Sequence, residues 1–397
     1  MKGKVYVVGL GVVSAIGNSV VENLASLESS RSGIGPITLF PSQLDLPVAE
    51  VKLSNRDLSR KLGYTNGNMS RTALLGILAA REALRDSALT IKNRRTGLIS
   101  ATTVGGMDLT ENFFVDFLRD TKQGRLRNMV AHECGHSTER IAADLGVKDF
   151  ISTVNTACSS SINAAIYGTR LIQNGYLDVV IAGGTDALTK FTLNGFNSLM
   201  ILDKEPCRPF DASRAGLNLG EGAGYLVLVS EKVLHDEKVK PLSFIAGFGN
   251  TNDAFHQTAS SPEGRGSFSA MQNALAMSGL KTEDIDYINL HGTGTQNNDS
   301  SEGAAVKRLF GEKVPRSSST KSFTGHTLGA SGGIEAVYSA LAIQHGCVYP
   351  NLRFASPIPA LNFIPQLTFQ RDLPIRHVLS NSFGFGGNCS AIILSKV

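Results

Sequence analysis

Residues 165–175 read AIYGTRLIQNG, and residues 336–346 read AVYSALAIQHG. Both segments have a tyrosine at the third position, an Ile-Gln pair and a closing glycine, and they lie nearly half of the 397-residue chain apart. A second pair of segments, residues 222–232 and 386–396, repeats glycines, an apolar run and a lysine. Internal repeats of this kind indicate that the chain consists of two similar halves.

The repeat predicts an N-terminal half over residues 1–240 and a C-terminal half over residues 241–397, because a charged stretch precedes a new apolar run there. The helical spacing of apolar residues predicts a helix over Ser70–Asp86. Short β-branched runs predict buried strands at residues 5–8, 96–100, 178–182, 225–229, 242–246, 287–290 and 391–394. The first strand is expected to end in a turn at Gly9. This alternation predicts an α/β fold with parallel sheets between layers of helices.

The composition excludes several classes of protein. Apolar residues make up 42% and charged residues 18% of the chain, which excludes a disordered protein. A net charge of +4 without a block of like charges argues against a nucleic-acid partner. No apolar run reaches the length of a membrane span, so no membrane partner is expected. Five scattered cysteines do not form a disulfide framework and are typical of a reducing compartment, so we expect a cytoplasmic protein.

The strongest local signal is Asn155–Ser161, in which a polar turn leads to Cys158 and then to a helix that is apolar nearly all round. This pattern places Cys158 at the start of a buried helix. Unpaired N–H groups and the positive end of the helix dipole stabilise a thiolate there, so Cys158 is a candidate nucleophile. The alternative is an inert buried cysteine, the commoner role of this residue.

Two further segments place titratable residues next to predicted strands and helices. His291 follows a predicted strand directly, at the position where active sites of α/β sheets form. Lys321, His326 and Glu335 precede or begin the helix that repeats the Cys158 helix. The duplication therefore predicts that His326 faces Cys158 across the two halves. Taken singly, each of these residues could equally belong to an ordinary loop.

Two other motifs are less specific. Asn381–Gly387 is a glycine-rich turn before the last strand, and it carries Phe383 and Phe385. His132–His136 is a literal H-E-x-x-H sequence, which on a single helix would indicate a zinc hydrolase. Gly135 inside the motif weakens the helix that this interpretation needs, so we expect no metal.

Together the four segments resemble the β-ketoacyl-acyl-carrier-protein synthases of the elongating, Cys-His-His type, condensing enzymes with the thiolase fold. The resemblance covers nearly the whole chain and implies a five-layer αβαβα fold built from two duplicated α/β halves. Further matches in the family's order are Val8–Ser14, Arg208–Asp211, Gly220–Gly224, Asp299 and Glu302. Such a co-linear set is much more specific than any single motif.

The resemblance implies that Cys158 accepts the acyl chain as a thioester, and that the backbone N–H groups of Cys158 and Phe385 form the oxyanion hole. His291 and His326 then stabilise the enolate formed when a malonyl thioester loses carbon dioxide, and Lys321 organises the two histidines. Supporting roles fall to Glu335, Asp299, Glu302 and Phe383. No cofactor is implied.

The resemblance also implies an acyl carrier protein as partner and a homodimer. Val104 matches the region of the acyl pocket, although the segment after it diverges and leaves the chain length open. Basic residues that could contact the carrier protein are Arg119, Lys122, Arg125, Arg127 and Lys204.

The main expectation is a 3-oxoacyl-acyl-carrier-protein synthase of fatty-acid biosynthesis that extends the chain on Cys158 by two carbons. The alternative within the fold is a specialised ketosynthase of a polyene or polyketide pathway, which could need a partner subunit. A non-catalytic partner subunit is disfavoured because Cys158, His291, His326 and Lys321 are all present.

Overall fold

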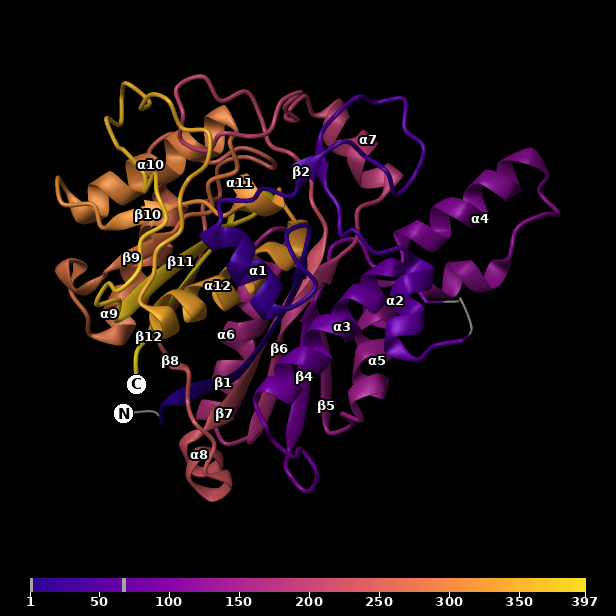
Figure 1. Ribbon diagram of the computed structural model, residues 1–397, viewed down its shortest axis with the longest axis horizontal. Coiled ribbons are helices and arrows are strands. Elements are labelled where there is room, and N and C mark those ends of the chain that lie inside the picture. The colour runs from indigo at the N-terminus through magenta and orange to yellow at the C-terminus, as the bar shows by residue number, and fades with distance from the viewer. Residues whose placement is uncertain (1–2, 66–68) are drawn as a thin grey trace.

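The structure is a computed structural model that describes residues 3–65 and 69–397 (Figure 1). In this described part, ten strands form one mixed sheet in the order β10-β9-β11-β12-β8-β1-β7-β6-β4-β5. They are β1 (Val5–Ser14), β4 (Thr96–Ala101), β5 (Phe150–Val154), β6 (Val179–Asp186), β7 (Gly222–Ser230), β8 (Ser243–Asn252), β9 (Tyr287–Asn289), β10 (Arg316–Ser318), β11 (His377–Phe383) and β12 (Asn388–Ser395). The short strands β2 (Ile34–Gly35) and β3 (Val48–Ala49) pair separately.

Helices connect most of these strands. The α-helices are α1 (Val20–Glu28), α2 (Asn55–Leu62), α3 (Arg71–Asp86), α4 (Met107–Arg119), α5 (Cys134–Leu145), α6 (Ser160–Gln173), α7 (Lys190–Ser198), α8 (Glu231–Glu237), α9 (Arg265–Ser278), α10 (Gln296–Phe310), α11 (Lys321–Thr324) and α12 (Ser331–His345). Short 3₁₀ turns are η1 (Leu126–Ala131), η2 (Thr282–Asp284), η3 (Leu328–Ala330) and η4 (Phe385–Gly387). No helix of the described residues is long and apolar enough to cross a membrane.

The two halves of the sheet repeat one strand order. Moving outward from the centre, the N-terminal half runs β1-β7-β6-β4-β5 and the C-terminal half runs β8-β12-β11-β9-β10. The halves are joined where residues 5–7 of β1 pair with residues 243–245 of β8. Helices α3, α5 and α6 occupy the same places between strands as α9, α10 and α12. This repetition is the duplication inferred from the sequence, whereas the exact division at residue 240 stays a prediction.

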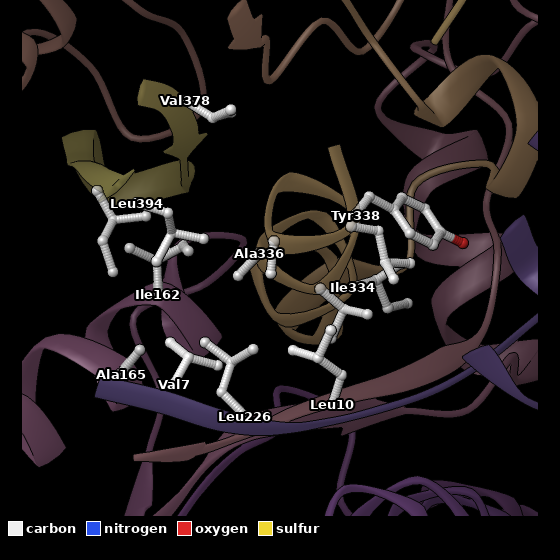
Figure 2. Packing of buried hydrophobic residues seen from close by; sticks show 14 of the residues in the cluster. Val7, Leu10, Ile162, Ala165, Leu226, Ile334, Ala336, Tyr338, Val378 and Leu394 are labelled. Carbon is white, nitrogen blue, oxygen red and sulfur yellow. The ribbon is translucent and has the colours of Figure 1, made fainter. Parts of the chain in front are cut away.

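The layers follow from the faces that the helices cover. One apolar cluster joins α6 and α12 to residues of both halves of the sheet, so these two helices form the central layer. Figure 2 shows Ile162 of α6 and Ile334 of α12 between strand residues of the two halves. A second cluster joins α3 and α5 to the outer face of the N-terminal half, and a third joins α9 and α10 to that of the C-terminal half. The predicted five-layer αβαβα fold is confirmed.

Two details of the predicted sheet are wrong. Strand β1 does not end at Gly9 but continues to Ser14. A Cβ at Gly9 would lie 2.2 Å from the backbone oxygen of Ala83, and one at Gly11 would lie 2.0 Å from that of Ala79, so these glycines let α3 cross the strand closely. The sheet is also mixed. Strands β4, β5 and β6 are parallel, as are β9, β10 and β11, but β1, β7, β8 and β12 pair antiparallel.

We predict that Gly224→Ala destabilises the fold by about 2 to 3 kcal/mol, because overpacking forces backbone to move. A Cβ at Gly224 on β7 would lie 2.4 Å from the backbone nitrogen of Ile334, at the start of α12. Gly195→Ala is the matched control, since its Cβ would meet nothing within 4 Å on α7, where alanine favours the helix. Urea unfolding measures both variants, and equal midpoints would contradict the close contact of α12 with the sheet.

Candidate active site

A strained turn presents Cys158 between β5 and α6. Ala157, the residue before it, has a φ of +54°, in the left-handed region that side chains disfavour. The turn is held because the N–H of Ser160 donates to the oxygen of Ala157 at 3.1 Å, and the N–H of Thr156 donates to Oγ of Ser160 at 2.8 Å. Helix α6 begins at Ser160, so Cys158 lies just before the helix start that the sequence predicted. Strain of this kind is concentrated at functional sites.

His326 meets Cys158 from the other half of the chain, as the duplication predicted. Its Nε2 lies 3.1 Å from Sγ of Cys158. The backbone N–H of Leu328 donates to Nδ1 of His326 at 3.3 Å, and Oγ of Ser331 lies 3.0 Å from the same nitrogen. Because a backbone N–H can only donate, Nδ1 is the acceptor and the neutral ring carries its proton on Nε2. His326 therefore donates a hydrogen bond toward the sulfur.

His291 is oriented by a buried lysine. It follows β9, and its Nδ1 lies 3.2 Å from Nζ of Lys321. Nζ of Lys321 also donates to Oε1 of Glu335 in a buried ion pair. An ammonium group can only donate, so Nδ1 of His291 is the acceptor in this contact. The neutral His291 ring therefore also carries its proton on Nε2. The rings of His291 and His326 lie 5.4 Å apart, and two N–H donors thus converge on one site.

Two buried carboxylates hold the turn that carries His291. Glu302 accepts from the backbone N–H groups of His291 and Gly292, both at 2.8 Å, and from Nδ2 of Asn381 at 3.0 Å. Asp299 accepts from the N–H of Gly294 at 3.2 Å and from that of Phe210 at 2.8 Å. The sequence placed Glu302 and Asp299 in supporting roles, and the structure places both directly beneath the turn.

The glycine-rich turn brings Phe385 against the nucleophile. Burial raises the pKa of the Cys158 thiol, and the backbone N–H of Phe385 is close enough to the sulfur to oppose part of that rise. A Cβ at Gly384 would lie 3.0 Å from the nitrogen of Cys158, so glycine permits this close approach. The ring of Phe385 stacks on Phe196 of α7 at 5.9 Å, and Phe383 lies 5.7 Å from the ring of His291.

Burial controls the ionisation of the site. It lowers the pKa of both His291 and His326 well below the usual range, with the charge of Lys321 acting in the same direction, so both rings are neutral at neutral pH. Burial also raises the pKa of Cys158 to about 11, and the charge of Lys321 offsets only part of this. The thiolate expected from the helix start is therefore not the resting state. Burial raises the pKa of Glu335 to about 7 against the opposing charge of Lys321.

A cleft of about 490 Å³ leads to these residues. Cys158, His291, His326, Phe383 and Phe385 line this cleft, and so do the polar residues Thr293, Thr295 and Asn297. The sequence analysis missed Phe196, Leu199 and Met200 of the cleft wall, and also the orienting contacts of Leu328 and Ser331. A backbone N–H carries no signal in the sequence, so the proton position on His326 could not be predicted.

Several predicted residues lie outside this cleft. Val104 packs in a separate apolar cluster with Leu188, Leu193, Leu217 and Leu328, and it does not line the cleft. The basic residues proposed for carrier contacts are all exposed and do not line the cleft either; these are Arg119, Lys122, Arg125, Arg127 and Lys204.

The H-E-x-x-H sequence does not form a zinc site of the expected kind. Helix α5 begins at Cys134 with Glu133 as its N-cap, so His132 and His136 do not share one helix. Nδ1 of His132 instead lies 3.1 Å from Oγ1 of Thr110. Residues 3–65 and 69–397 contain no group of three His, Cys, Asp or Glu side chains that could hold a metal ion.

Sequence and structure comparisons agree with this geometry. The sequence profile of "Beta-ketoacyl synthase, N-terminal domain" matches residues 2–233, and that of "Beta-ketoacyl synthase, C-terminal domain" matches residues 242–355. The chain is 34% identical over 409 residues to 3-oxoacyl-[acyl-carrier-protein] synthase 2 of Staphylococcus aureus (strain N315), covering 99% of this chain and 98% of the relative. It is 35% identical over 415 residues to the protein of the same name in Synechocystis, covering 100% and 98%.

Solved structures of ketosynthases have the same fold as this chain. The ishigamide ketosynthase/chain length factor superposes with a TM-score of 0.95 at 30% identity over the full length of both chains. A β-ketoacyl synthase from Burkholderia phymatum superposes with a TM-score of 0.86 at 26% identity, also over both full lengths.

We predict that alkylation of Cys158 by iodoacetamide accelerates about tenfold per pH unit between pH 7 and 10, because only the thiolate reacts. With a pKa of about 11, about one thiol in ten thousand is ionised at pH 7. Peptide mass spectrometry follows the reaction, and Cys158→Ala identifies the signal of the other four cysteines. A rate that is already maximal at pH 7 would contradict the effect of burial.

Proposed function

Because the chain belongs to the β-ketoacyl synthase family of acyl-transferring condensing enzymes, we propose that it is a 3-oxoacyl-[acyl-carrier-protein] synthase. It extends a carrier-bound acyl chain by two carbons in fatty-acid biosynthesis. The observation that supports this most is the 3.1 Å contact between Sγ of Cys158 and Nε2 of His326, with His291 presenting a second neutral N–H donor beside it.

The first step is acyl transfer to Cys158. The sulfur attacks the carbonyl carbon of the acyl thioester, and the tetrahedral oxyanion accepts from the N–H groups of Cys158 and Phe385. The carrier thiol leaves and takes up the proton that Cys158 gives up. His326 is not the base for this proton, since its Nε2 already carries one and its Nδ1 accepts from Leu328. Its N–H instead stabilises the sulfur as negative charge develops.

The second step is decarboxylation and condensation. A malonyl thioester enters the cleft after the first carrier has left, and its C–C bond to the carboxylate breaks to release carbon dioxide. The electron pair moves onto the thioester oxygen, which accepts from Nε2–H of His291 and of His326. The resulting carbanion attacks the acyl carbon on Cys158 and the C–S bond breaks. Cys158 leaves as a thiolate that takes up a proton from solvent, and the 3-oxoacyl product leaves on the carrier.

Lys321 and Glu335 position the donors in this mechanism. Lys321 fixes the proton of His291 on Nε2 and contributes a positive charge near the departing carboxylate. Glu335 holds Lys321 in place, and Glu302 and Asp299 hold the turn of His291. Phe385 acts as a gate that swings when the acyl chain is bound, and Val104 borders the acyl pocket, which is distinct from the cleft described above. These steps need no cofactor.

The partner is an acyl carrier protein, as the names of the relatives in Staphylococcus and Synechocystis suggest. The exposed basic side chains between Arg119 and Arg127, together with Lys204, are our candidates for contacts with an acidic carrier surface. Five free cysteines fit a reducing compartment, so we place the protein in the cytoplasm.

We expect intact-protein mass spectrometry to show an acyl adduct after incubation with a medium-chain acyl-carrier protein, and no adduct on Cys158→Ala. His326→Ala and His291→Ala keep the adduct but lose about 100-fold or more in condensation with malonyl-carrier protein, because each removes a donor to the enolate oxygen. Assaying acyl chains of several lengths and degrees of unsaturation in parallel gives the preferred substrate.

Absence of an adduct with any acyl donor on a folded protein would contradict this function. An adduct formed only with polyunsaturated chains, or only after addition of a second subunit, would favour the specialised polyene or polyketide ketosynthase. The similarity to the ishigamide ketosynthase/chain length factor keeps that alternative open.

We also propose a homodimer that forms at the β5 edge of the sheet, where Ile151 is 42% exposed. The apolar side chains of Phe114 and Leu118 on α4 are exposed as well, and Figure 1 shows α4 projecting from the body. Exposed apolar surface of this kind marks an interface.

Light scattering should therefore give twice the 42.2 kDa of the chain. Ile151→Lys should shift the protein toward monomer, because it places a charge on the β5 edge. Tyr176→Lys is the control, since this side chain is 68% exposed and lies in the turn after α6. A monomeric wild type would contradict the dimer, and equal behaviour of the two variants would contradict the β5 interface.

A further inference from the structure

Asp186 is a completely buried carboxylate that the mechanism above does not use. It ends β6, and it does not line the cleft. Its Oδ1 accepts from Oγ1 of Thr102 at 2.5 Å and from the N–H groups of Thr103 and Val104 at 2.9 and 3.1 Å. Its Oδ2 accepts from Oγ1 of Thr103 and from the N–H of Gly329, both at 2.7 Å. Five donors on one side chain are far more than the burial of a single polar group requires.

The donors come from two loops that lie far apart in the sequence. Thr102, Thr103 and Val104 follow β4 in the N-terminal half, and Gly329 belongs to η3 in the C-terminal half. Asp186 thus joins the segment proposed to border the acyl pocket to the turn that follows His326.

The turn held by Asp186 is strained. Leu328 has a φ of +52°, although it is not a glycine. Its N–H is the group that donates to Nδ1 of His326, and the next N–H along the chain, that of Gly329, donates to Asp186. A strained backbone persists only where its surroundings hold it in place. The carboxylate of Asp186 and the apolar packing of the Leu328 side chain provide this hold.

We infer that Asp186 is a positioning residue that keeps the Leu328 N–H on Nδ1 of His326 and so keeps the catalytic proton on Nε2. This inference rests on the proposed function for its consequence in catalysis. Without the anchor, η3 relaxes, the N–H of Leu328 turns away, and His326 loses its fixed tautomer. Decarboxylation and condensation then suffer, because they use the Nε2–H donor. Acyl transfer suffers less, because its oxyanion hole is formed by Cys158 and Phe385.

Burial raises the pKa of Asp186, and the hydrogen bonds from Thr102, Thr103 and Val104 oppose that effect. Both carboxyl oxygens of Asp186 accept from backbone N–H groups, which is the pattern expected of an ionised carboxylate because it can only accept. The variant that tests the anchor is Asp186→Asn, which keeps the volume and one acceptor oxygen. Its amide nitrogen cannot accept from Gly329.

The test combines two measurements on the full chain. The first is the ¹⁵N spectrum of the histidine rings, in which His326 is assigned by comparison with His326→Gln. The wild type should show an unprotonated Nδ1 and a protonated Nε2, and Asp186→Asn should show a mixture of tautomers. The second compares acylation of Cys158 with condensation. Asp186→Asn should lose about tenfold or more in condensation and stay within about threefold in acylation.

Asp144→Asn is the matched control. The Asp144 side chain on α5 is 2% exposed, and its carboxylate pairs with Arg81 of α3 and accepts from Tyr64, neither of which belongs to the site. It should lower thermal stability without changing the His326 tautomer or the ratio of the two rates. Gly329→Ala tests the same contact from the other side, since its Cβ would lie 2.9 Å from Oδ2 of Asp186, and it serves if Asp186→Asn does not fold.

Ring nitrogens of His326 that stay as in the wild type in Asp186→Asn and Gly329→Ala would overturn the inference. Equal losses of acylation and condensation would also overturn it, because a merely structural role predicts them. A wild type that forms no acyl adduct would reject the proposed function, while the nitrogen signals would still decide the role of Asp186.

Discussion

The contact between helices α6 and α12 is the constraint on which the site depends. These helices come from different halves of the chain, yet the N–H of Gly333 donates to Oγ of Ser161 at 2.7 Å. A Cβ at Gly332 would lie 2.5 Å from the side chain of Ile162, so the two backbones can approach only because of glycine. The close approach brings the turns before the two helices together. It therefore sets the distance between Cys158 and His326, which are 168 residues apart.

The site that results works with neutral hydrogen-bond donors instead of free charges. Two histidines buried beside Lys321 lose their tendency to take up a proton, and their tautomers are fixed by groups that can only donate. A buried ion pair, Lys321 with Glu335, lies behind His291, where Nζ of Lys321 contacts Nδ1 of that ring. Breaking such a pair by removing one partner costs roughly 3 to 5 kcal/mol. The pair thus fixes His291 firmly, and the polar site needs no rearrangement when negative charge develops on an oxygen.

The sequence predicted the repeat, the layers and the identity of the polar residues, because these depend on residue type and spacing. It predicted the ends of the strands less well. Gly9 was interpreted as a turn residue because glycine is typical of turns. Glycine is equally typical of a strand position that a helix crosses closely, and the sequence alone does not distinguish the two. It also predicted a thiolate at Cys158 from the helix start alone, whereas the ionisation of a thiol depends on how deeply it is buried. Val104 was expected at the acyl pocket, and this stays a prediction; its side chain packs into the cluster around Leu188.

The duplication explains why one cleft can serve two successive reactions. The parallel strands β4 and β5 are followed by Thr102 and by the turn of Cys158, and β6 ends at Asp186. Their counterparts β9 and β10 are followed by His291 and by the Lys321–His326 segment, and β11 ends at Phe383. Ligands of α/β proteins bind at the carboxyl ends of such strands. In the proposed mechanism the two halves differ at these ends: one supplies the nucleophile and the anchor, and the other supplies the two histidine donors. Because each set of residues belongs to its own half, the nucleophile can hold an acyl group while the donors act on a second thioester.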